Sequence, residues 1–82
     1  MGDNLELRED IRLYILKRVQ LEELDDEIDL FQAKIVNSLF VIELIIYIEK
    51  TFNIRVLSTD LSMNNFRSVR SIHEFIVMKK TT

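Results

Sequence analysis

The chain of 82 residues contains no cysteine, and His73 is its only histidine. The absence of cysteine excludes a disulfide, and one histidine is too few for a zinc site built from cysteine and histidine. Small domains often depend on such cross-links for part of their stability. Here stability must come from apolar packing, and a hydrophobic content of 48% can supply it. We therefore expect neither a disulfide nor a bound metal.

Proline is also absent, and the only glycine is Gly2. Tight turns between β-strands depend on these two residues, so a sandwich or barrel would be difficult to build. The length suits a single domain. The sequence therefore predicts one all-α domain over residues 1–82, a small four-helix bundle with an ordered core at about residues 5–79.

Long hydrophobic runs and a basic charge excess are missing as well. The apolar run over residues 39–48 contains Glu43 and is far shorter than the ~20 residues of a membrane span. The net charge is −3, from 14 acidic and 11 basic residues. Nucleic acid binding requires a basic surface, so nucleic acid is not an expected partner. The charged N-terminus does not resemble a secretion signal, and we expect a cytoplasmic monomer.

Helical spacing of apolar residues predicts the first helix over residues 5–20. Its apolar stripe consists of Leu7, Ile11, Tyr14, Ile15 and Val19. Residues 21–37 contain a dense acidic cluster, and close like charges disfavour a continuous helix. We interpret them as a long irregular connection anchored by Leu24, Ile28, Leu30 and Phe31. Connections this long usually have a function, and this one ends at Ser38.

The most hydrophobic segment predicts a second helix over residues 38–52. On a helical wheel the centre of its core stripe is Val41, Leu44, Ile45, Ile48 and Phe52, and the opposite, solvated arc is Glu43, Tyr47 and Lys50. A second apolar row contains Leu39, Ile42 and Ile46. This row could pack against the last helix or the long loop, or it could contact a partner protein.

The remaining chain predicts two further helices. Residues 54–57 are expected to form an extended loop, and Ser58 or Thr59 to cap a short third helix that ends near Phe66. Leu61 and Met63, like Phe66, are expected to turn inward. The last helix is expected over residues 68–79, with Ser68 as its N-cap.

No catalytic arrangement is visible, and we expect no enzyme activity. His73 is expected to face outward, and no third group is placed to orient it toward Ser38. The carboxylates lie in solvated segments, without the apolar enclosure that acid–base catalysis requires. Ser38 itself allows two interpretations. Either Ser38 or Asn37 could cap the second helix, or Ser38 could be an exposed attachment point, because a helix N-terminus favours a bound phosphate group.

Several short motifs occur in an ordered series along almost the whole chain. The series is Asp29-Leu30-Phe31, Asn37-Ser38-Leu39, Glu43-Leu44, Glu49-Lys50-Thr51-Phe52-Asn53-Ile54 and Ser71-Ile72-His73-Glu74-Phe75-Ile76. In this order and spacing the chain resembles the acyl carrier and peptidyl carrier protein family. The likeness is greatest to free-standing carriers of polyketide and nonribosomal peptide pathways. The resemblance implies a bundle with a long first loop and a short third helix.

The resemblance implies that Ser38 carries a covalent 4′-phosphopantetheine group, installed from coenzyme A by a phosphopantetheinyl transferase. The protein would then hold an acyl or aminoacyl group as a thioester, receive it from a loading enzyme and present it to downstream synthase or tailoring enzymes. By the same resemblance, partners would dock on the second helix. The implied docking residues are Asn37, Leu39, Ile42, Glu43, Ile46 and Glu49.

The chain departs from the family pattern at two positions next to the serine. Asn37 stands where the family usually has aspartate, and Phe40 is bulky where many carriers have a small or acidic residue. These differences point to specialised partners. The alternative to a carrier is a small helical interaction module in which Ser38 is only a helix N-cap.

Overall fold

The computed structural model describes residues 3–81, with side chains from residue 6 onward. Helices are the only regular secondary structure in this range. They are α1 (Asp3–Val19), α2 (Ser38–Phe52), α3 (Met63–Phe66) and α4 (Val69–Thr81), with a 3₁₀ turn, η1 (Ser58–Asp60), before α3. The predicted all-α bundle of three longer helices, one short third helix and a long first loop is confirmed.

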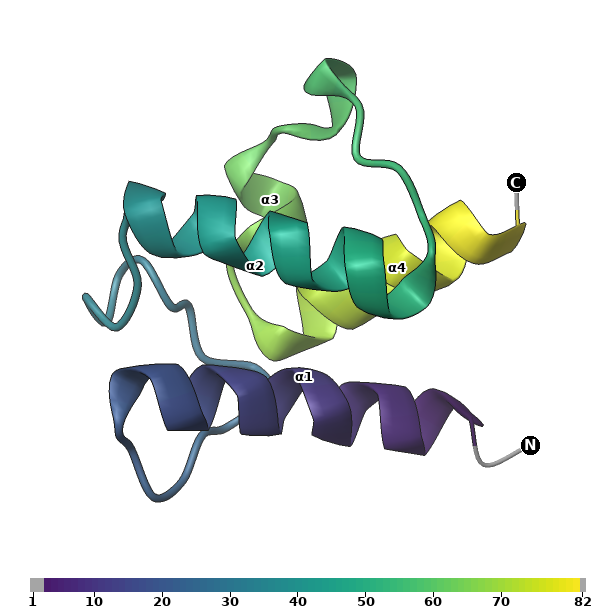
Figure 1. The fold of residues 1–82 in the computed structure, drawn as a ribbon. Coiled ribbons are helices and arrows are strands. Elements are labelled where there is room, and N and C mark those ends of the chain that lie inside the picture. The colour runs from purple at the N-terminus through teal and green to yellow at the C-terminus, as the bar shows by residue number, and fades with distance from the viewer. Residues whose placement is uncertain (1–2, 82) are drawn as a thin grey trace.

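The helices pack around one core. In Figure 1, α2 runs back along α1 in the opposite direction, and the start of α2 lies on the side away from both chain ends. Helix α4 packs against both α1 and α3. Fully buried side chains come from α1, the long loop, α2 and α4; they include Ile11, Ile15, Leu30, Leu44, Ile48, Val69, Ile72 and Ile76. The bundle therefore fixes the position of the start of α2.

Residues 20–37 form the irregular connection that the acidic cluster predicts. Its backbone is tied to the second half of the chain: the Leu30 N–H donates to the Arg67 carbonyl at 2.6 Å, and the Arg70 N–H donates to the Asp26 carbonyl at 3.0 Å. Leu24 and Leu30 are buried as expected, whereas the prediction for Ile28 is wrong, because its side chain is 37% exposed. The loop is thus held in place by hydrogen bonds as well as by apolar anchors.

The third helix begins later than the sequence predicts. Ser58 starts only the turn η1, and the N-cap of α3 is Ser62, whose hydroxyl accepts from the Asn64 N–H. Phe66 is buried as predicted, but Leu61 and Met63 are 60% and 59% exposed. The late start of α3 places Leu61 outside the helix and Met63 in its first turn, which explains why the inward prediction fails for both.

Two side chains predicted to face solvent lie against other helices instead. His73 is only 7% exposed, since it lies on the side of α4 that is covered by the rest of the bundle. Tyr47 is partly buried and stacks on Tyr14 of α1, with ring centroids 4.0 Å apart. The core face of α2 is therefore rotated toward Phe40 and Tyr47, and Phe40 fills part of the core. Helix α4 extends to Thr81, two residues beyond the prediction.

Candidate functional site

Asn37, and not Ser38, is the N-cap of α2. Its backbone is extended, with φ −134° and ψ −176°, and its side-chain oxygen accepts from the Phe40 N–H at 2.9 Å. Ser38 is the first residue of the helix proper. The interpretation of Ser38 as a helix N-cap is therefore wrong. An uncharged asparagine performs the capping, for which asparagine and aspartate are about equally suited.

Ser38 is exposed at a helix end that suits an anion. The first N–H groups of any helix have no partner within it, and the helix dipole is positive there. In α2 the Phe40 N–H donates to the Asn37 side chain, whereas the N–H groups of Ser38 and Leu39 have no partner within the helix. The first turn of α2 contains no acidic residue. A phosphodiester on the Ser38 hydroxyl would therefore lie beside backbone N–H donors, with no carboxylate in the first turn of the helix to repel it.

A groove opens beside Ser38, between α2 and the segment around α3. Its volume is about 590 Å³. It is lined by Phe31, Asn37, Ser38, Val41, Ile42, Ile45, Leu61, Ser62, Met63 and Phe66. Most of these side chains are apolar, so the environment next to the serine is hydrophobic. Leu61 and Met63, which the sequence analysis assigned to the interior, form part of this wall. The serine at position 62 in front of Asn64 was the one available signal for the later helix start.

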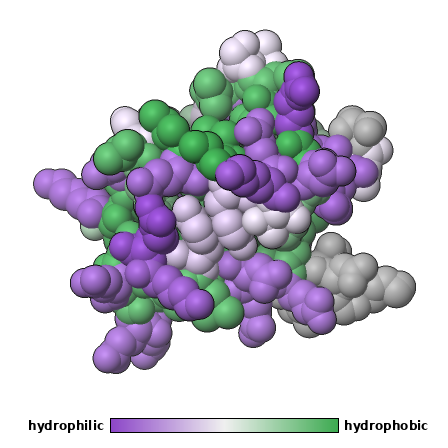
Figure 2. Space-filling model, in the orientation of Figure 1, coloured by the Kyte–Doolittle hydropathy of each residue, from purple (hydrophilic) through white to green (hydrophobic). Residues whose placement is uncertain are grey.

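The second apolar row of α2 faces outward. Leu39, Ile42 and Ile46 are 65%, 55% and 49% exposed. The interpretation that this row packs against the last helix or the long loop is therefore wrong. The hydrophobic surface in the upper half of Figure 2 gathers over α2 and the segment that follows it. Exposed apolar groups that adjoin one another in this way are typical of an interaction surface.

The two acidic candidates on α2 are engaged within the chain. Glu43 forms an ion pair with Arg18 of α1. A carboxylate oxygen of Glu49 accepts from the Val56 N–H at 2.9 Å and so holds the extended loop after α2. Both side chains are partly buried. The ion pair offsets the negative charge of Glu43, whereas Glu49 keeps its charge, because its donor is a neutral backbone N–H.

Asp26 is the main electrostatic link between the acidic loop and the helices. Arg12 donates two hydrogen bonds to its carboxylate, at 2.8 and 2.9 Å, and Arg8 lies 3.6 Å away. The pKa of Asp26 lies below its ordinary value of 3.8, mainly because Arg12 donates hydrogen bonds to the carboxylate. Burial opposes this lowering of the pKa, and the positive charges of Arg12, Arg8 and His73 add to it. This cluster is structural, since it lies between α1, the loop and α4.

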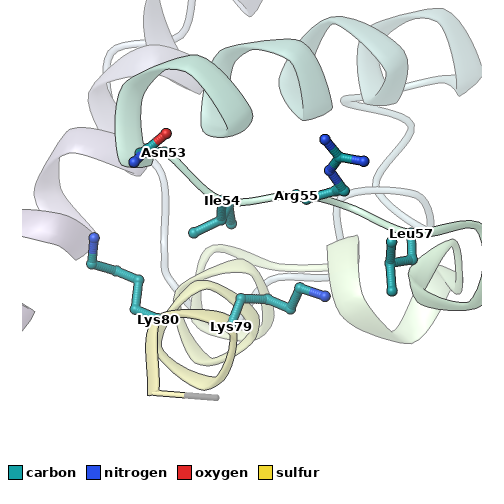
Figure 3. Close-up of a pocket in the computed structure, with 6 residues that line it drawn as sticks. All are labelled: Asn53, Ile54, Arg55, Leu57, Lys79 and Lys80. Atoms are coloured by element: carbon teal, nitrogen blue, oxygen red, sulfur yellow. The ribbon is translucent and has the colours of Figure 1, made fainter.

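A second depression lies at the opposite end of α2 and has a basic lining. It has a volume of about 500 Å³, and Figure 3 shows Arg55, Lys79 and Lys80 around it. The ammonium of Lys79 contacts Asp60 at 2.8 Å, and that of Lys80 donates to the Phe52 carbonyl at 3.3 Å. The two lysines point to different sides of the depression (Figure 3). Both ammonium groups are engaged by contacts within the chain and do not converge on one anion position.

Comparisons with models of known protein families and with curated proteins found no match. Over residues 3–81, no helix combines the length and hydrophobicity needed to cross a membrane. The side chains described by the structure include no group of three or more histidine, aspartate or glutamate residues placed to hold a metal ion.

Proposed function

We propose that this protein is an acyl or aminoacyl carrier that is modified at Ser38 with 4′-phosphopantetheine. The observation that carries the proposal is the exposed serine at the first position of α2, beside free backbone N–H groups and an apolar groove. Asn37 supplies the cap, so the helix does not require the Ser38 hydroxyl. That hydroxyl is free to be a point of attachment.

The residues around Ser38 have distinct roles in this proposal. The N–H groups at the start of α2 offer hydrogen bonds to the phosphodiester, and the helix dipole favours its negative charge. The group supplies a thiol on a flexible arm, which holds the cargo as a thioester. The protein itself performs no chemistry on the cargo. Tethering raises the effective concentration of the cargo at each partner enzyme.

The proposal assigns three kinds of partner to the protein. A phosphopantetheinyl transferase modifies Ser38, a loading enzyme attaches the acyl or aminoacyl group, and synthase or tailoring enzymes act on it. A role in polyketide, nonribosomal peptide or extender-unit biosynthesis in the cytoplasm fits this set of partners. Leu39, Ile42 and Ile46 are exposed on the side of α2 that these partners would approach. Contacts to Asn37, Glu43 and Glu49 complete the proposed docking set.

Intact-mass measurement tests the modification. Purified protein is incubated with coenzyme A and several phosphopantetheinyl transferases, including one from the same source as the protein. We expect one phosphopantetheinyl addition to the wild type and none to Ser38→Ala. Ser58→Ala, which removes another exposed serine hydroxyl, should be modified like the wild type. If no transferase modifies the wild type, the carrier function is wrong.

A further inference from the structure

The groove beside Ser38 has two sides that are supported by different helices. One side is α2, and the other belongs to residues 57–66, which include η1 and α3 and are here called the wall segment. In Figure 1 the chain that follows α2 rises away from that helix and returns at α3. The main packing partner of α3 is α4. The wall segment supplies four residues to the groove: Leu61, Ser62, Met63 and Phe66.

Both ends of the wall segment are anchored. Just before it, the Val56 N–H donates to the Glu49 carboxylate of α2 at 2.9 Å. Just after it, the Arg67 carbonyl accepts from the Leu30 N–H of the long loop at 2.6 Å. Phe66, the last residue of the wall segment, is only 2% exposed. A movement of the wall segment would therefore take place between these two anchors.

Asp60 connects the parts of the wall segment to one another and to α4. One oxygen of its carboxylate accepts from the Leu57 N–H at 2.9 Å and from the Lys79 ammonium of α4 at 2.8 Å. Its carbonyl accepts from the Asn65 side-chain amide and from the Ser62 N–H, both at 2.8 Å. A change in the position of Asp60 would therefore move η1 and the start of α3 together.

Among the described residues, the ion pair of Asp60 with Lys79 is the only hydrogen bond or ion pair that joins the wall segment to another element. The other hydrogen bonds of the wall segment stay within it. The side chains of Lys79 and Asp60 are 17% and 16% exposed, whereas those of Arg70 and Glu27 are 55% and 63% exposed. Salt screens partly buried pairs less than exposed ones. The ion pair of Asp60 with Lys79 is therefore suited to hold the wall segment at ordinary ionic strength.

Little apolar burial supports the middle of the wall segment. No side chain from Leu57 to Asn65 is fully buried, and those of Leu61 and Met63 are 60% and 59% exposed. Segments with few buried apolar contacts open locally at a low cost in free energy. We therefore expect loss of the ion pair to release the wall segment while α2 stays in place.

We propose that Lys79 is a positioning residue that, through its ion pair with Asp60, holds the wall segment as a strap along the groove. When the ion pair opens, Leu61 and Met63 move away from α2 and the groove widens, while Ser38 keeps its position. Access to the groove is thus set by a residue that does not line it. This inference concerns the unmodified protein and does not depend on the proposed carrier function.

Spin labels on the two sides of the groove test the proposal. The chain has no cysteine, so Ile42→Cys combined with Met63→Cys places nitroxide labels only at these two exposed positions. Dipolar broadening in EPR spectra measures the fraction of molecules in which the labels are close together. We expect Lys79→Met and Asp60→Asn each to lower this fraction at least about twofold. Asp60→Asn retains an acceptor for the Leu57 N–H and loses only the charge.

Two further lysine variants are the matched controls. Lys79→Arg keeps a cation for Asp60 and should retain the close labels. Lys80→Met removes the neighbouring lysine, whose ammonium donates to the Phe52 carbonyl, and should also retain them. Amide NMR signals of α1 and α2 should keep their positions in every variant. The proposal is overturned by close labels that persist in Lys79→Met and Asp60→Asn, by their equal loss in Lys80→Met, or by large signal shifts throughout α1 and α2.

Discussion

At the scale of single residues, Asn37 and Ser38 are neighbours with different functions in the fold. The side chain of Asn37 satisfies one of the N–H groups at the start of α2. Ser38 is the first residue of α2, and its side chain is exposed. The cap is therefore independent of the candidate attachment point, and the two positions can be altered separately.

This separation predicts different stabilities for two alanine variants. Asn37→Ala should lower the free energy of unfolding by about 1 kcal/mol, because the Phe40 N–H loses its acceptor. Ser38→Ala should change it by less than about 0.5 kcal/mol, as is typical of exposed positions without such a role. Urea denaturation followed by circular dichroism measures both. Asn37→Asp is the control that keeps the cap, and a larger loss for Ser38→Ala than for Asn37→Ala would contradict the assignment.

At the scale of the elements, the acidic loop is attached to the helices through Asp26. Its carboxylate binds Arg12 of α1, and its carbonyl accepts from Arg70 at the start of α4. One residue thus connects three parts of the chain. The loop leads directly to the N-cap of α2, so this attachment also positions the candidate site.

The lowered pKa of Asp26 makes part of the stability dependent on pH. The contact with Arg12 stabilises the ionised carboxylate in the folded state, so the folded pKa lies below the ordinary value of 3.8. The stabilisation is complete above that value and is lost as the pH falls through the folded pKa. Between pH 5 and pH 2, Asp26→Asn should therefore lose less stability than the wild type. Urea midpoints across this pH range measure the difference, and parallel curves for the two proteins would contradict the role of Asp26.

At the scale of the whole molecule, one apolar core joins all four helices and the long loop. Its buried members include Ile15 of α1, Leu30 of the loop, Leu44 of α2, Phe66 of α3 and Ile76 of α4. No helix has a separate core within the described residues. The elements therefore depend on one another for burial of their apolar faces.

A shared core predicts cooperative unfolding in a single step. Helix content by far-ultraviolet circular dichroism and tyrosine environment by near-ultraviolet circular dichroism should change at the same urea concentration. The dependence of the unfolding free energy on urea should be about 1 kcal/mol per molar, as for other small domains. Two separated transitions would show that part of the bundle unfolds independently.

The sequence by itself determined the helical class, the bounds of α2 and the irregular loop before it. These features follow from local causes: the spacing of apolar residues, the repulsion between clustered acids and the absence of proline and interior glycine. The exposed row of Leu39, Ile42 and Ile46 was also visible as a separate stripe. The exposure of this row could not be predicted, because a helical wheel shows which residues share a face of the helix but not whether another element covers that face.

Only the tertiary structure decided which faces were covered and which charged side chains were paired. It buried His73, partly buried Tyr47 and exposed Leu61 and Met63, since these positions depend on where α1 and α3 pack. It also paired Glu43 with Arg18, which lies 25 residues earlier in the chain. Contacts between residues so far apart leave no periodic pattern in the sequence.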